Sequence, residues 1–220
     1  MIPLRDSTPS RHFPVITVLL ILINLYIFYQ EVMLGPALDS ALSVFGLVPA
    51  RIEKYPYDIF SYLPFLSSMF LHGSWMHVIG NMWTLWLFGD NVEDQMGKGR
   101  FLLFYLICGV IAALAHYLVN PGSNVPVVGA SGAVAGIMGA YFIMFRQARV
   151  LTFIPPFFLI TIPAWVFLGF WALSQLYSGT AGLLTDGGGQ IAFWAHVGGF
   201  AGGMVLFKLF LRDDKESYQL

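Results

Sequence analysis

The sequence is poor in charge: Asp, Glu, Lys and Arg make up only 10% of its 220 residues, whereas 57% are hydrophobic. An ordinary soluble domain is about a quarter charged, so this chain has too little charge to cover a water-exposed surface. Its mean hydropathy of +0.72 agrees. The net charge of −1 argues against nucleic acid as a partner, because nucleic-acid binding calls for a basic patch. We therefore expect a polytopic membrane protein.

Cysteine is nearly absent as well. Cys108 is the single cysteine, which excludes a disulfide within the chain and a metal site built from thiolates. The sequence also lacks internal repeats and any sign of a second domain, which indicates one membrane domain over residues 1–220. The first twelve residues are polar and lack the apolar core and cleavage site of a signal peptide, so the first apolar segment is expected to be a retained helix.

What the sequence has in abundance is apolar segments of membrane-spanning length. A helix needs about 20 residues to cross the hydrocarbon core. Six segments are candidates, and we expect an all-α bundle of six transmembrane helices at about residues 13–33, 74–90, 100–119, 131–145, 160–177 and 190–211.

The distribution of Lys and Arg predicts the orientation of these spans, because cytoplasmic loops carry the excess of positive charge. With both termini cytoplasmic, only Arg51 and Lys54 lie outside. The other nine basic residues then lie inside: Arg5, Arg11, Lys98, Arg100, Arg146, Arg149, Lys208, Arg212 and Lys215. The long first outer loop, residues 34–72, is rich in aromatics and proline and is expected to lie partly in the membrane interface.

This topology brings four polar residues to one depth in the outer half of the bilayer. Ser131 begins the fourth span, His196 lies about two turns into the sixth, and His77 and Asn81 lie near the outer end of the second. A titratable group inside a membrane segment is costly and is by default a candidate for function. We therefore expect these four residues to form a site within the lipid bilayer, in a hydrated cavity that opens outward.

A serine beside a histidine suggests a nucleophile and its base. Ser131 stands at a helix N-terminus, where free backbone N–H groups can stabilise an oxyanion. No acidic residue is evident to orient His196, so we expect a Ser–His dyad. Each residue also has a plain structural reading, since a membrane serine usually bonds its own backbone and a histidine can simply join two helices.

His77 and Asn81 are four residues apart and share a helix face, from which both can donate hydrogen bonds to an oxyanion. The alternative is a helix–helix hydrogen bond. His72 is expected to be structural and to hold down the first outer loop. Three histidines near one depth also raise the possibility of a metal site, but neither a carboxylate nor a thiolate accompanies them, and we expect no metal.

Glycines follow both candidate reactive residues at helical spacing. Small residues at such spacing let membrane helices approach closely, which a serine oxygen needs in order to reach an imidazole. The fourth-span glycines are Gly132, Gly136 and Gly139, and the sixth-span glycines on the face of His196 are Gly199 and Gly203. The outer loop at residues 178–189 ends in Asp186 and three glycines, which predicts a mobile lid.

These motifs resemble those of the rhomboid intramembrane serine proteases. The resemblance covers nearly the whole chain, and order, spacing and helix assignment agree. It is carried by Gly129-Ala130-Ser131-Gly132, by Ala195-His196-Val197-Gly198-Gly199, and by His72, His77 and Asn81 with four and three residues between them.

The resemblance implies hydrolysis of peptide bonds within the membrane, without a cofactor. Ser131 would be the nucleophile and His196 the general base, then the general acid. Asn81, His77 and the Ser131 backbone N–H would form the oxyanion hole, with Gly129, Gly132, Gly199 and His72 in support. Substrates would be membrane proteins whose helices unwind near their outer end, and the fifth span with the loop before the sixth would gate their entry. A prokaryotic plasma membrane is the expected location.

The chain departs from the family pattern at Ala135, where many members have an aromatic residue that packs on the histidine. Phe200 or Trp194 is expected to hold the His196 ring instead. The first outer loop also lacks the Trp-Arg pair of many members. Two other readings stay open: a catalytically silent relative that binds membrane clients, whose usual signature is loss of the serine or histidine, and a small transporter with a histidine proton relay, which would call for membrane carboxylates or a repeat.

Overall fold

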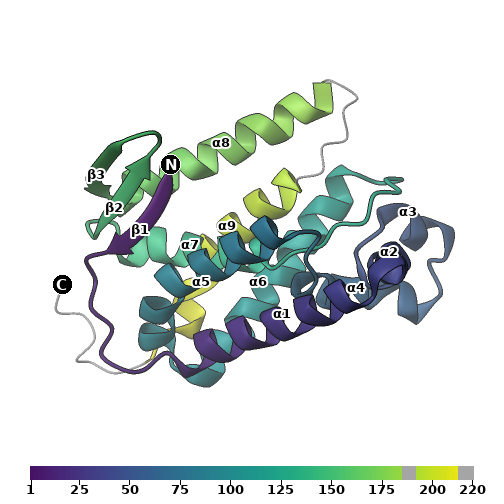
Figure 1. The fold of residues 1–220 in the computed structure, drawn as a ribbon, viewed down its shortest axis with the longest axis horizontal. Coiled ribbons are helices and arrows are strands. Elements are labelled where there is room, and N and C mark those ends of the chain that lie inside the picture. Colours follow the sequence, from purple (N-terminus) through teal and green to yellow (C-terminus); the bar gives the residue numbers. More distant parts are fainter. Residues whose placement is uncertain (185–191, 213–220) are drawn as a thin grey trace.

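Long helices dominate the computed structural model, which describes residues 1–184 and 192–212. Figure 1 shows them as one bundle with short helices at one end and a small sheet at the other. The long helices are α1 (Val15–Met33), α5 (Trp75–Met96), α6 (Lys98–Val119), α7 (Ser131–Met144), α8 (Ala164–Leu184) and α9 (Phe193–Leu206). The short ones are α2 (Leu38–Phe45), α3 (Pro49–Lys54), α4 (Pro64–Ser67) and the 3₁₀ turns Gly35–Ala37, Ile59–Tyr62, Ser68–Phe70 and Phe207–Phe210.

Length and apolar composition qualify three of the described helices as membrane spans: Val15–Met33, Lys98–Val119 and Phe193–Phe210. α7 has only 14 residues and is too short by this measure. Each of the six predicted spans nonetheless corresponds to one long helix. The predicted lid at residues 178–189 falls partly within α8. Its Asp186, Gly187, Gly188 and Gly189 lie outside the described residues, as do Gln190 and Lys215.

A three-stranded antiparallel sheet corrects the expectation of an all-α fold. It consists of β1 (Ile2–Asp6), β2 (Arg149–Ile154) and β3 (Phe158–Pro163) in that order. β2 and β3 form a hairpin, and β1 pairs with the other edge of β2, for example Pro3 with Thr152. The first residues of the predicted fifth span, 160–163, belong to β3, so α8 begins at Ala164 and not at residue 160.

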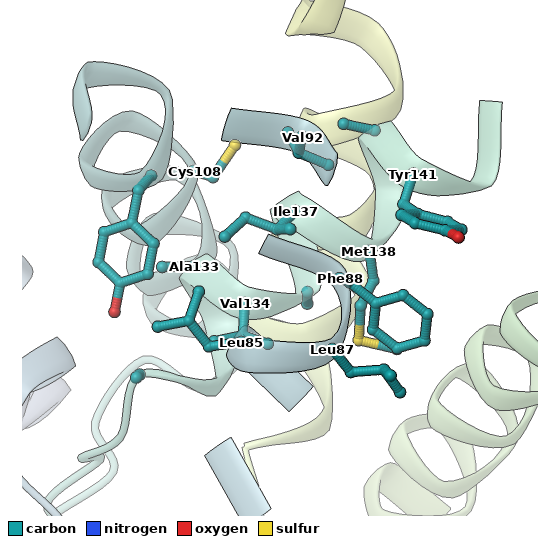
Figure 2. Packing of buried hydrophobic residues seen from close by; sticks show 14 of the residues in the cluster. Leu85, Leu87, Phe88, Val92, Cys108, Ala133, Val134, Ile137, Met138 and Tyr141 are labelled. Atoms are coloured by element: carbon teal, nitrogen blue, oxygen red, sulfur yellow. The ribbon is translucent and has the colours of Figure 1, made fainter. Parts of the chain in front are cut away.

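The core lies where α5, α6 and α7 meet. Figure 2 shows α5 side chains such as Leu85 and Phe88 directed towards Ile137 and Met138 of α7. All four are buried, together with Cys108 of α6. Burial of apolar side chains between these three helices fixes their relative positions, and with them the first turns of α5 and α7.

The N-terminal segment and Arg212 both lie near the junction of α5 and α6. Asn91 Nδ2 donates to the Thr8 carbonyl at 3.0 Å, and Arg212 N donates to the Gln95 carbonyl at 3.2 Å. In Figure 1 this end also holds β1, whereas α2 and α3 lie at the opposite end. The N-terminal segment and residue 212 therefore lie on the same side of the bundle.

Candidate active site

Ser131 and His196 meet at the end of the bundle that faces α2 and α4. Ser131 is the first residue of α7, and His196 lies in the first turn of α9. The Ser131 Oγ and His196 Nε2 atoms are 2.8 Å apart, although the two residues are 65 positions apart in the sequence. This distance is within the range for a nucleophile hydrogen-bonded to its base.

Glycines let α7 and α9 approach until their backbones touch. A Cβ added at Gly199 would overlap the carbonyl oxygen of Gly132, and one at Gly203 would overlap that of Gly136. We call these four residues, together with Gly139 of α7, the glycine seam. Without side chains along the seam the helix axes come close enough for the short Ser131 side chain to reach His196.

The loop before α7 places a third helix at the same point. Gly129 has a φ of +127°, a conformation that side-chain-bearing residues rarely adopt. A Cβ at Gly129 would lie 2.6 Å from His77 Nε2, so the backbone passes directly against the imidazole of α5. The Gly129 N–H donates to the Ser68 carbonyl at 2.9 Å, which anchors this loop.

Asn81 adds an unused donor. It lies on α5 one turn after His77, and its Nδ2 atom would be 3.6 Å from a Cβ at Gly129. Asn81 is only 7% exposed, and Nδ2 has no hydrogen-bond partner among the described residues. A buried amide donor without a partner carries a free-energy cost and is positioned to bind a group that is not part of the chain.

A cavity of about 870 Å³ connects these groups. Ser131, His196, His77 and Asn81 all line it. Small residues form much of the remaining wall, among them Gly80, Gly109, Ala112 and Ala133. Within the described ranges no three His, Cys, Asp or Glu side chains lie close enough to hold a metal ion. The cavity therefore offers a hydroxyl, imidazoles and an amide to a bound molecule.

His72 lies behind this wall. Its backbone N–H faces both carboxylate oxygens of Glu31, at 3.1 Å each, which ties the loop over residues 34–72 to the end of α1. Its buried ring packs edge-on against His77, with 5.1 Å between the centroids. His72 thus holds the loop through its backbone, and its ring supports the ring of His77.

Two residues of α8 that the sequence analysis did not single out contact His196. The Oε1 atom of Gln175 lies 2.7 Å from His196 Nδ1, and the Trp171 ring lies 5.8 Å from the imidazole between centroids. The expectation that Phe200 or Trp194 holds the His196 ring is corrected: Trp171 does so, and Phe200 packs behind Trp171 at 5.9 Å. Trp194 lies beside Gly179 of α8.

The helical periodicity of the sequence marks both residues. Leu168, Trp171 and Gln175 are three and four positions apart, which places them on one face of a helix. Ala164 and Leu168 on this face are fully buried. A glutamine that continues a buried helical face in an apolar segment calls for a partner, because an unpaired amide is costly there.

The arrangement suits acyl transfer. The Ser131 hydroxyl can pass its proton to His196, and the N–H groups of the first turn of α7 have no partners within the helix. Asn81 and His77 approach the same point from α5. A carbonyl bound beside Ser131 would therefore face a nucleophile on one side and several N–H donors on the other.

Comparison with known proteins assigns most of the chain to one family. Residues 60–213 match the family model described as the Rhomboid domain. From Bacillus subtilis (strain 168), the "Putative rhomboid protease YdcA" is 37% identical over 79 residues, covering 36% of this chain and 39% of the relative. The "Rhomboid protease GluP" of the same organism is 40% identical over 75 residues, covering 34% of this chain and 14% of the relative.

The name of a further relative includes the word "mitochondrial". The "Presenilin-associated rhomboid-like protein, mitochondrial" of Mus musculus is 30% identical over 144 residues, covering 62% of this chain and 35% of the relative. This chain thus matches less than two fifths of the length of each of these three relatives.

Proposed function

The chain belongs to the rhomboid family, and on this premise we propose that it is an intramembrane serine endopeptidase. It hydrolyses peptide bonds in or near the transmembrane segments of other membrane proteins. The single observation that carries the proposal is the 2.8 Å contact between Ser131 Oγ and His196 Nε2 on the wall of a cavity. Two relatives whose names include "rhomboid protease" support it.

In the proposed reaction Ser131 and His196 act in turn. Ser131 Oγ attacks the scissile carbonyl carbon while its proton passes to His196 Nε2. The resulting imidazolium donates this proton to the leaving amine, and the acyl group stays on Ser131. A water molecule then attacks the acyl carbon, gives one proton to His196, and releases the new carboxyl end as the proton returns to Ser131 Oγ.

The oxyanion of the tetrahedral intermediate is stabilised by Asn81, His77 and the Ser131 backbone N–H. The unpaired Nδ2 donor of Asn81 supports this role, since a substrate oxygen would supply the partner that the described residues lack. Loss of one such donor costs serine proteases about 10²–10³ in kcat. Gly129, Gly132 and Gly199 support the site by letting the backbone approach His77, Ala112 and α7 respectively.

We further propose six membrane spans with both termini cytoplasmic and the site in the outer half of the bilayer. The bias of Lys and Arg supports this orientation. The common position of the N-terminal segment and residue 212 at the α5–α6 junction supports an even number of crossings. A prokaryotic plasma membrane is the proposed location.

The test is cleavage of a transmembrane reporter by purified protein in lipid. Ser131→Ala and His196→Ala should each reduce cleavage to background, whereas Ser40→Ala and His12→Ala, which make the same changes at residues that do not line the cavity, should cleave like the wild type. A fluorophosphonate probe should label the wild type and not Ser131→Ala. Cleavage that survives Ser131→Ala would overturn the mechanism. Folded wild-type protein that neither cleaves nor reacts with the probe would instead indicate a client-binding relative.

A further inference from the structure

His196 makes a hydrogen bond at each of its ring nitrogens. Nε2 meets Ser131 Oγ at 2.8 Å, and Nδ1 meets Gln175 Oε1 at 2.7 Å. A neutral imidazole has one donor nitrogen and one acceptor nitrogen. For Nε2 to accept the proton of Ser131, the hydrogen must sit on Nδ1, and the group facing Nδ1 must be an acceptor.

Neighbouring contacts decide which end of the Gln175 amide faces His196. The Ser174 Oγ lies 2.6 Å from the backbone carbonyl of Trp171, which can only accept, so the Ser174 hydroxyl donates there. Ser174 Oγ then accepts from Gln175 Nε2 at 3.1 Å. With Nε2 engaged by Ser174, the acceptor Oε1 faces His196.

These contacts form one directed chain. It runs from Ser131 through His196, Gln175 and Ser174 to the Trp171 carbonyl, and every group donates to the next. Reversing one link would set two donors or two acceptors against each other. The chain therefore selects the imidazole tautomer whose Nε2 lone pair points at Ser131.

Trp171 restrains the same imidazole from another direction. Its ring lies 5.8 Å from the His196 ring between centroids at an angle of 34°, one helical turn before Gln175. Gln175 thus holds the edge of the imidazole while Trp171 covers its face, and both come from α8. A ring held at edge and face has little freedom to turn away from Ser131.

We propose that Gln175 is a positioning residue for the general base. This role rests on the proposed function. Gln175 completes a Ser131–His196–Gln175 arrangement in which a neutral amide occupies the place of the acidic residue in serine protease triads. The amide fixes tautomer and orientation. Because it carries no charge, it does not stabilise the imidazolium as a carboxylate does.

Two substitutions separate these effects. Gln175→Leu removes the acceptor and keeps the approximate size of the side chain. A positioned general base contributes about 10²–10⁴-fold, and we expect Gln175→Leu to lose at least about tenfold of this in kcat. KM and the unfolding temperature should stay close to the wild type. Gln30→Leu, the same change at an exposed position of α1, should leave kcat unaltered.

Gln175→Glu restores the acceptor and adds a negative charge. An anion beside an imidazole favours the protonated ring, so the acidic limb of the kcat/KM profile should move to higher pH. At pH values above the acidic limb, the kcat of Gln175→Glu should be well above that of Gln175→Leu. A residue that only packs α8 against α9 would show neither the rescue by glutamate nor the shift in the profile.

Running Ser131→Ala in the same assay separates the two proposals. Cleavage by Ser131→Ala would overturn the proposed function itself. If Ser131→Ala is inactive but Gln175→Leu keeps the wild-type kcat, only the role of Gln175 is overturned. The same holds if Gln175→Leu loses activity in step with its unfolding temperature and Gln175→Glu leaves the pH profile unmoved.

Discussion

The two sides of α9 are packed in opposite ways. Towards α7 it presents Gly199 and Gly203, and the backbones of the two helices touch. Towards α8 it presents His196 and Phe200, which meet the large side chain of Trp171. The side of α8 that faces away from α9 is apolar and exposed. Leu173, for example, is 67% exposed. One neighbour of α9 is thus held by backbone contact and the other by side chains alone.

This difference separates two requirements of the site. The distance between nucleophile and base is set by the glycine seam, which leaves almost no room for adjustment. The orientation of the base is set from α8, through one hydrogen bond and one ring contact. Changes along the seam should therefore act on folding and catalysis together, whereas changes on α8 should act mainly on catalysis.

The largest effect should come from one added methyl group on the seam. Gly203→Ala would drive its Cβ into the Gly136 carbonyl, and overpacking of this kind costs about 1–3 kcal/mol or more. Gly182→Ala on α8 meets nothing within 4 Å, and alanine favours a helix over glycine by up to about 1 kcal/mol. The same substitution should thus lower the unfolding temperature in α9 and raise it slightly in α8.

Thermal unfolding in a fixed detergent measures both variants side by side. Cleavage should fall with stability in Gly203→Ala and persist in Gly182→Ala. Equal unfolding temperatures for the two variants would contradict the contrast between the two sides of α9.

A smaller effect, larger on kcat than on the unfolding temperature, is expected for Trp171→Ala. An aromatic contact is worth about 0.5–1.5 kcal/mol, which corresponds to about two- to tenfold in rate if it acts on the transition state. Trp165→Ala is the matched control, because Trp165 lies on the same helix but is 48% exposed. kcat and unfolding temperature should be measured together. A variant Trp171→Ala that unfolds as early as Gly203→Ala but keeps its kcat would refute this division of roles.

The smallest effect is expected at the sheet, far from the cavity. Burial raises the pKa of Asp6, and the hydrogen bond from the Tyr141 hydroxyl at 2.5 Å opposes that rise. Because the folded state then holds its proton more tightly than the unfolded state, this carboxyl makes stability fall as pH rises from its unfolded pKa through its folded pKa.

Asp6→Asn should remove that fall, since an amide keeps an acceptor for Tyr141 without titrating. The measurement is unfolding temperature between pH 4 and pH 7 for the two proteins. An unchanged slope in Asp6→Asn would show that another group, such as Asp90, carries it. Cleavage at neutral pH should be the same for both proteins.

The sequence alone predicts the helical bundle because its signals are local. Apolar runs mark the long helices, and the order of spans brings Ser131, His196, His77 and Asn81 to one level. The predicted resemblance to the rhomboid family is confirmed by the match over residues 60–213. The start of α7 at Ser131 agrees with the predicted span to the residue.

The features that the sequence did not predict depend on partners far along the chain. Residues 158–163 are apolar enough to extend a span, and only pairing with β2 makes them a strand. The contact between Gln175 and His196 depends on the packing of α8 against α9, which the sequence does not specify locally. A sequence without an acidic partner for His196 can still supply an orienting group, because an amide satisfies the same nitrogen without a charge.

The pairing of β1 with β2 has a consequence for biosynthesis. Ile2 pairs with Phe153, which is added to the growing chain 151 positions later. Throughout that interval β1 has no edge to join, while α1, α5, α6 and α7 are already being made. Once made, the β2–β3 hairpin can pair with β1, and α8 follows directly after the hairpin. The sheet can thus close only at the stage of synthesis at which α8 and α9 follow.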